Sequence, residues 1–172
     1  MSTNNTQPHE VLAAVVDLIG TVDGTGTWNN DLTGKVFVGL PADPMTTQDI
    51  AVYVSPGTLR SERAPRTPLG EFTHTLRFVV IGYVRTASTA DANATGGAVA
   101  EAWKLWWDIS RVLGAKASQS LPTVGNPTGL VHLFAFDDEV QPNLAGPYAE
   151  DLGGGLGACA GAVSYQWGQN IS

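Results

Sequence analysis

The sequence lacks several features that would narrow its function. It holds a single cysteine, Cys159, which excludes an intramolecular disulfide framework and a metal site built from several cysteines. No apolar run approaches the roughly 20 residues that a membrane-spanning helix needs, and the polar first ten residues lack the pattern of a secretion signal. These absences predict a soluble globular domain, intracellular or assembled inside the cell, with no membrane partner.

Positive charge is also scarce. The chain carries 9 Lys and Arg against 16 Asp and Glu, a net charge of -7. A protein that binds nucleic acid by neutralising phosphates needs a basic face, so this balance argues against sequence-specific nucleic acid as a partner. Most of the basic residues lie within 60–116, between two acidic segments. Such a basic middle either attracts another copy head to tail or is scattered by the fold, and the sequence leaves both open.

Charged residues of both signs make up only 15% of the chain, against about 25% in an ordinary soluble domain. Arginine outnumbers lysine, and five tryptophans accompany it. Protein interfaces favour Arg and Trp and deplete Lys and Glu, because strongly hydrated, flexible charges are costly to bury against a partner. The composition therefore indicates either an interface protein or the amino-acid usage of a GC-rich genome.

Hydrophobic periodicity predicts an α+β fold. We expect a mostly antiparallel sheet of about four to six strands, packed with an N-terminal helix and one long central helix, in a single domain spanning residues 1–172. Both faces of the strand over 75–85 are apolar in its middle, which predicts a central strand covered on both sides. The expected elements are helices over 11–19 and 91–113, and strands over 35–40, 50–54, 75–85, 130–136 and 158–167.

Two long loops are expected, near 55–74 and 137–157, and the first is either a long loop or the tip of a hairpin. The first contains three prolines, which remove backbone donors and argue against a central strand. It also contains Arg60, Arg63 and Arg66, and we predict that these arginines contact an acidic surface of a neighbouring subunit or partner. The second loop is acidic and rich in Gly and Pro.

The helix over 91–113 carries more apolar surface than packing on one sheet face requires. Its apolar arc spans roughly 180°, and indole rings supply most of the excess. Trp103 and Trp107 extend this arc to its far flank. Ordinary core packing can absorb them, and the alternative is a contact with a neighbouring subunit; we predict that Trp103 or Trp107 lies at a subunit boundary.

No catalytic or metal-binding constellation stands out. His9, His74 and His132 are far apart in the sequence, and no serine lies in a GxSxG turn. Cys159 lies among small strand residues, where a buried, inert thiol is expected. The adjacent acids 137–139 lack calcium-loop spacing and read as a solvated loop. The sequence thus predicts no catalytic residue, no metal ligand and no cofactor, and it argues against an enzyme.

The order of elements carries a resemblance. An amphipathic N-terminal helix precedes IAVYV and a segment bearing prolines and arginines; then follow TLRFVVIGYVR, a small-residue stretch over 87–97, a helix ending in WWDISRVLG, and late strands. In this order the chain resembles the tail terminator proteins of long-tailed bacteriophages, over roughly 8–113 and more loosely to Trp167. The segment 137–157 departs from that pattern.

The resemblance implies a structural virion protein. Members of that family form a hexameric ring on the head-proximal end of the tail tube, stop tube polymerisation, and present a surface to the head–tail connector. The implied partners are copies of the chain itself, the tail tube protein and the connector protein, with assembly in the host cytoplasm. The alternatives are another tail or neck component, such as a tube subunit or connector, and, from a different class, a small soluble enzyme or a cellular binding module.

Overall fold

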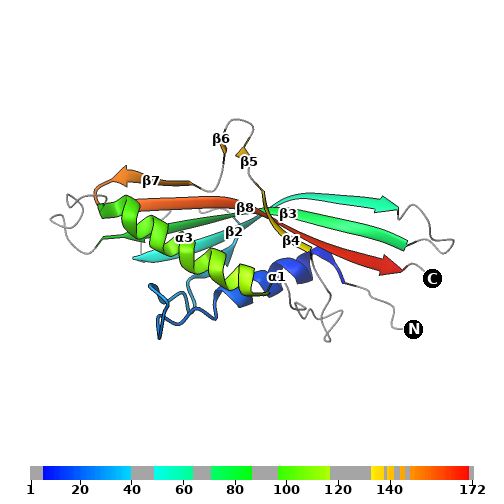
Figure 1. Cartoon of the computed structure of the whole chain (residues 1–172), viewed down its shortest axis with the longest axis horizontal. Coiled ribbons are helices and arrows are strands. Elements are labelled where there is room, and N and C mark those ends of the chain that lie inside the picture. Colours follow the sequence, from blue (N-terminus) through cyan, green and yellow to red (C-terminus); the bar gives the residue numbers. More distant parts are fainter. Residues whose placement is uncertain are drawn as a thin grey trace.

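The computed structural model describes residues 6–39, 49–63, 71–86, 97–116, 133–137, 139–141, 144–145 and 148–170. The described part of the chain contains two α-helices and eight β-strands (Figure 1). In chain order these are α1 (Pro8–Ile19), β1 (Val36–Val38), β2 (Ile50–Arg63), β3 (Glu71–Arg85), α3 (Gly97–Lys116), β4 (Leu133–Asp137), β5 (Glu139–Gln141), β6 (Leu144–Ala145), β7 (Tyr148–Gly153) and β8 (Leu156–Asn170).

The main sheet has six strands, in the order β1-β2-β3-β8-β4, with β7 pairing to the same edge of β8 further along. The pair β1–β2 is parallel and the other pairs are antiparallel. The strands β5 and β6 form a separate two-stranded pair. The predicted α+β class, with a mostly antiparallel sheet, an N-terminal helix and a central helix, is confirmed, and the central position of β3 with it.

Both helices pack on one face of the sheet, where they form the core. The helix α1 contacts β1, β2 and α3, and α3 contacts β3, β7 and β8. Burying each large apolar side chain here contributes roughly 1.5–3 kcal/mol relative to leaving it exposed. The core side chains, all 5% exposed or less, include Val11, Val15 and Ile19 from α1, Leu105, Trp106 and Ile109 from α3, and Val52, Phe78, Val80 and Val163 from the sheet.

Glycines on the sheet allow α3 to approach the strands closely. A Cβ on Gly82 would stand 2.7 Å from Cδ2 of Leu105 and 2.8 Å from the Cys159 sulfur. A Cβ on Gly157 would overlap the carbonyl of Ala98. The small residues on β3 and β8 therefore form the bed on which the helix lies, and any side chain there would push the helix away.

A buried carboxylate ties α3 to the loop between α1 and β1. Asp108 is 0% exposed. Its Oδ2 accepts hydrogen bonds of 2.9 Å from the backbone N–H groups of Asn29 and Asn30, and both Asn side-chain amides donate to the carboxylate as well. Arg111 lies over the Trp28 ring at 4.6 Å and donates to the Thr27 carbonyl. The carboxylate is saturated with donors, which identifies its role as structural.

The long strands β2, β3 and β8 continue as an extension of the sheet, here called the arm: residues 59–63, 71–76 and 165–170 (Figure 1). At its base β4 still pairs with Tyr165 and Gln166, and beyond them the arm has three strands. A register shift between Pro56 and Leu59 marks where β2 enters it. Two side-chain contacts tie its strands together, Ser61 Oγ with His74 Nδ1 at 2.8 Å and Gln166 Nε2 donating to Thr75 Oγ1 at 3.3 Å. The arm therefore consists of paired strands and is not an irregular loop.

The expectation of a long loop near 55–74 is therefore wrong for residues 55–63 and 71–74, which are strand. These residues pair as a hairpin of β2 and β3, which is closer to the alternative expected for this segment. Pro56 is tolerated because it lies at the register shift and beyond the end of β1, where β2 forms a sheet edge. Within 137–157, residues 139–141, 144–145 and 148–153 are also strand rather than irregular chain. Three parts of the expected segments lie outside the described residues: 64–70 of the first loop, 91–96 of the long helix and 130–132 of the strand over 130–136.

The expectation that β3 is covered on both sides is correct for one face only. Phe78, Val80 and Val84 are buried under the helices, whereas Val79, Ile81 and Tyr83 on the other face are half-buried. Residues of one strand alternate between the two faces of the sheet. The set that contains Phe78, Val80 and Val84 packs against helix side chains, so both described helices lie on that face. The second face is called the helix-free face below.

Candidate assembly surfaces

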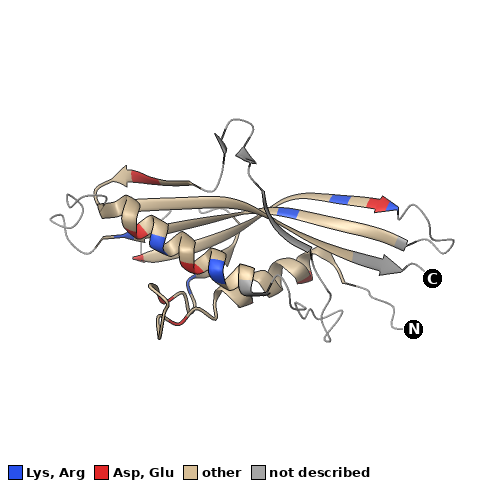
Figure 2. Cartoon of the chain, viewed as in Figure 1, with Lys and Arg blue, Asp and Glu red and all other residues tan. Residues whose placement is uncertain are grey.

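The first candidate surface is the outer side of α3. Trp106 points inward and is 5% exposed, but Trp103 and Trp107, one helical turn apart, are 44% and 64% exposed. Beside them Lys104 forms an ion pair with Glu101 at 2.6 Å, part of the alternating charges that Figure 2 shows along this helix. A pair of exposed indoles on one helix flank is unusual for surface that stays in water, because large apolar patches mark interaction sites.

The second candidate surface is the arm, which carries the predicted arginines. Arg60 and Arg63 are exposed on β2, and Arg60 forms an ion pair with Glu62 at 2.6 Å. With both side chains more than half exposed, this pair contributes little to stability. Arg66 lies outside the described residues. Within one chain, Arg60 and Arg63 lie on the arm while Trp103 and Trp107 lie on α3, so the structure does not bring the two sets into one site (Figures 1 and 2).

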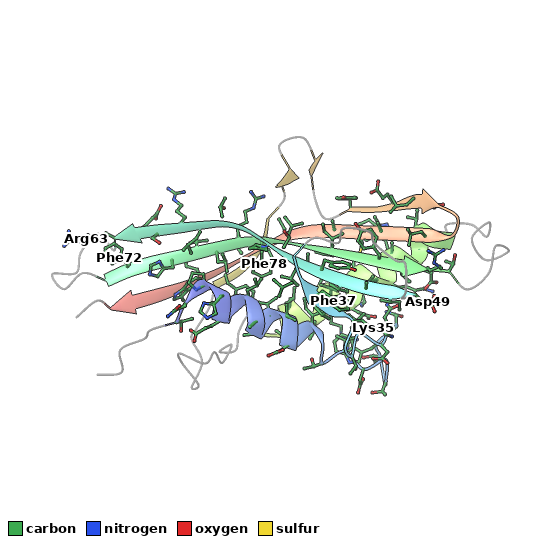
Figure 3. The ribbon with its side chains drawn as sticks, turned by 180° about the vertical axis from the view of Figure 1, so that it is seen from behind. Lys35, Phe37, Asp49, Arg63, Phe72 and Phe78 are labelled. Atoms are coloured by element: carbon green, nitrogen blue, oxygen red, sulfur yellow. The ribbon has the colours of Figure 1, made fainter. Side chains whose placement is uncertain are left out.

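The third candidate surface, on the helix-free face, is an aromatic patch formed by Phe37, Tyr53, Tyr83 and Tyr148. The ring centroids of Phe37 and Tyr53 are 5.5 Å apart, and those of Tyr53 and Tyr83 are 6.0 Å apart. All four side chains are only half-buried. In Figure 3, which shows the molecule from behind, Phe37 lies on the half of the sheet away from Arg63 and Phe72.

Sheet register explains how residues distant in sequence make this patch. Phe37 pairs with Tyr53, Tyr53 with Ile81, Ile81 with Ala160, and Ala160 with Tyr148, so one row crosses five strands. The next row places Glu150 opposite Ala158, which pairs with Tyr83. Sequence reasoning placed Tyr83 on the second face of its strand but missed the patch, because the pairing partners of β1 and β7 cannot be read from local alternation.

The pKa values of Tyr83 and Tyr148 in the patch are raised by burial and by their close neighbours. Burial raises the pKa of the Tyr83 phenol, and the nearby Tyr148, Tyr53 and Glu150 raise it further. Burial also raises the pKa of Tyr148, with Glu150 as the next cause. The patch therefore presents neutral phenols with a carboxylate at its rim, a combination of apolar body and polar edge that is common in protein interfaces.

Groups that could carry chemistry are placed without a shared site. Burial raises the pKa of Cys159 to about 12, so its thiol stays protonated, as the sequence suggested. His74 lies between Phe72 and Trp167, with ring centroids 6.4 Å and 5.4 Å away, and His9 is exposed on α1. His132 lies outside the described residues. Among the described residues, no three His, Cys, Asp or Glu side chains gather as metal ligands do.

A shallow depression lies between α1 and β1, with a volume of about 260 Å³. Val16, Asp17, Gly20, Gly34 and Val36 line it. Asp17 is the one titratable side chain among these five, so the depression offers no acid and base together. The helices that the structure describes include none long and apolar enough to cross a bilayer.

Comparison with known proteins gives little further identification. No protein-family model matches the chain, and no curated protein matches it. Among solved structures, a chain of the "Virion of native gene transfer agent (GTA) particle" aligns over 93% of this chain and 96% of that chain, with 15% identity and a TM-score of 0.45. A likeness this distant does not bear on the function of this chain.

Proposed function

We propose that this protein is a structural virion component that acts as a phage tail terminator. In this proposal copies of the chain close into a ring, cap the head-proximal end of the tail tube, and present a surface to the head–tail connector. The protein works by shape and surface complementarity and transforms no molecule. The ring contact is heterologous, joining two different surfaces of successive subunits, because such contacts close into rings when the rotation allows.

The observation that carries the proposal is apolar surface left open in a single chain. Two indoles on α3 and four aromatic rings on the helix-free face are exposed or half-buried in the same subunit. Each exposed aromatic ring costs hydration free energy that a partner would recover. The element order that resembles tail terminators supplies the particular virion role.

The proposal assigns the arm an electrostatic part. Arg60, Arg63 and Arg66 would meet acidic surface of a neighbour, since both ends of the chain are acidic. Replacing all three by alanine should weaken assembly while leaving the far-ultraviolet circular dichroism and the thermal midpoint close to those of the wild type. Unchanged assembly would count against this part of the proposal.

Electron microscopy of negatively stained protein tests the whole proposal. The purified chain would be imaged alone and after mixing with tail tubes. We expect rings in the first sample or capped tubes in the second. Small featureless particles in both samples, together with a monomeric mass at high concentration, would overturn the proposal and favour an enzyme or a cellular binding module.

A further inference from the structure

We infer that the arm of one copy docks on the aromatic patch of the next copy, with Arg63 of the arm facing Glu150 at the rim of the patch. This inference rests on the proposed function, because it specifies which two surfaces make the ring contact. It adds a named occupant for the patch, a second copy of this chain.

The arm carries apolar side chains and a cation on one of its two sides. Leu59 pairs with Leu76, and Arg63 pairs with Phe72, so all four side chains lie on the same side of the arm. Leu76 is 5% exposed, but Leu59 is 47% exposed and Phe72 is half-buried. This side of the arm therefore presents two accessible apolar side chains, Leu59 and Phe72, on either side of the polar Ser61–His74 pair, with one cation near the tip. Figure 3 shows Phe72 and Arg63 at the end of the sheet, beyond α1.

The patch combines aromatic rings with an anion. Its four rings are apolar, and Glu150 lies on the same face, since Glu150 pairs with Ala158 and Ala158 pairs with Tyr83. Glu150 is exposed, and it is close enough to raise the pKa of both Tyr83 and Tyr148. The patch thus offers an apolar floor and one anion at its edge, the complement of the apolar side of the arm.

The positions of the arm and the patch favour a contact between two copies. The arm and the patch lie on opposite halves of the same long sheet, as the labels Arg63 and Phe37 in Figure 3 show. They also lie on opposite faces, because the arm uses the side of Leu76 and the patch uses the helix-free face. One chain cannot fold its own arm onto its own patch, but successive copies can satisfy every arm and every patch head to tail.

Both surfaces are preorganised. The arm is held by the Ser61–His74 and Gln166–Thr75 contacts, by stacking of His74 on Phe72 and by a tilted contact of His74 with Trp167. The patch is fixed by the register of five strands. Because the backbone of both surfaces is already held in paired strands, ordering on contact is confined to exposed side chains such as Arg63 and Glu150.

A charge-reversal cycle on the full chain tests the inference, with mass measured by sedimentation velocity and ring formation by negative stain. Arg63→Glu and Glu150→Arg should each raise the dissociation constant of the assembly about ten-fold or more. Combining them should return it to within about three-fold of the wild type, because the pair is restored with reversed signs. Asp17→Arg makes the same charge change as Glu150→Arg, but on the exposed side of α1, and it should leave assembly unchanged.

Cross-linking provides an independent readout. A Leu59→Cys chain and a Tyr53→Cys chain, each made in a Cys159→Ala background, should form an interchain disulfide when mixed and oxidised. Neither chain alone should form that dimer, since the contact joins two different surfaces.

The outcomes separate this inference from the proposed function. Assembly that survives both single reversals, or a double reversal no better than the singles, overturns the arm-to-patch contact while leaving ring formation standing. Reversals that spare the ring but abolish tube capping would assign the patch to the tube protein and also overturn the inference. A wild-type chain that never assembles overturns both.

Discussion

The indole of Trp106 lies directly over Gly161, so that residue 161 has no room for a side chain. Trp106 is the one inward-facing tryptophan on α3, and Gly161 lies on β8 between Cys159 and Val163, whose side chains are fully buried. The contact joins the central helix, which carries the first candidate surface, to the sheet that holds the arm and the aromatic patch. The position of α3, and with it that of Trp103 and Trp107, depends on this fit.

We therefore expect Gly161→Ala to destabilise the fold by about 1–3 kcal/mol, because a methyl group would overlap the ring and force the helix outward. Urea unfolding followed by tryptophan fluorescence measures this change. Gly114→Ala is the matched control: nothing lies within 4 Å of a Cβ there, and the helix favours alanine, so stability should be unchanged or slightly higher. Equal stability of Gly161→Ala and wild type would contradict the packing described here.

The buried carboxylate gives a second prediction. Asp108→Asn replaces an acceptor oxygen with an amide that faces the N–H groups of Asn29 and Asn30. Unfolding should become easier by about 1–3 kcal/mol, since buried donors lose their acceptor. Hydrogen exchange of residues 21–35 should accelerate more than that of β3. The exposed Asp17→Asn serves as the control and should change stability by less than about 0.5 kcal/mol.

The exposed indoles give a third prediction. Replacing Trp103 and Trp107 together by serine should leave the free energy of unfolding within about 1 kcal/mol of the wild type, because both side chains are exposed in the single chain. Assembly or tube capping should weaken, because Trp anchors tend to dominate interface energetics. Sedimentation velocity and negative stain measure the loss. Normal assembly of the double variant would remove α3 from the list of assembly surfaces.

Trp106→Ala, by contrast, should cost about 3–5 kcal/mol of stability, since it empties a core position against Gly161. Comparing Trp106→Ala with the Trp103 and Trp107 double variant therefore separates a loss of stability from a loss of contact between subunits.

Local pattern predicted most of the helices and strands, because each needs only its own residues. The period of apolar residues marked α1 up to Gly20 and marked the alternation of β3 and β8. It failed over 55–63, where prolines indicated a loop. Those residues are strand because β3 supplies a long partner and the register shift accommodates Pro56. Proline argues against a central strand, because it has no backbone N–H to donate to a neighbouring strand. At Pro56, however, β2 is the edge of the sheet and needs no such donor there.

The candidate site was predictable only in part, for a physical reason. Trp103 and Trp107 could be singled out as candidates because one helix sets their spacing, and both side chains are exposed in the single chain. Their place at a subunit boundary stays a prediction. The aromatic patch could not, because Phe37 and Tyr148 are brought beside Tyr53 and Tyr83 by pairings of strands far apart in sequence. The same holds for Asp108, whose partners are 78 and 79 residues away.

The buried thiol and phenols predict how stability depends on pH. Burial raises the pKa of Cys159 to about 12, and it raises the pKa of Tyr83, Tyr148 and Tyr165 as well. A group whose pKa is higher in the folded state holds its proton there while the unfolded chain releases it. Its contribution is therefore complete below the unfolded pKa, near 9 for the thiol, and is lost as the pH rises toward the folded pKa.

Stability should accordingly fall between about pH 9 and pH 12, with little change between pH 6 and pH 8 from these groups. Cys159→Ala should lower the slope of unfolding free energy against pH over pH 9–11, whatever its effect on stability at pH 7, because one of the proton-holding groups is gone. Urea unfolding at a series of pH values gives both slopes. Identical slopes would show that Cys159 titrates alike in the folded and unfolded chain, contrary to its complete burial beneath α3.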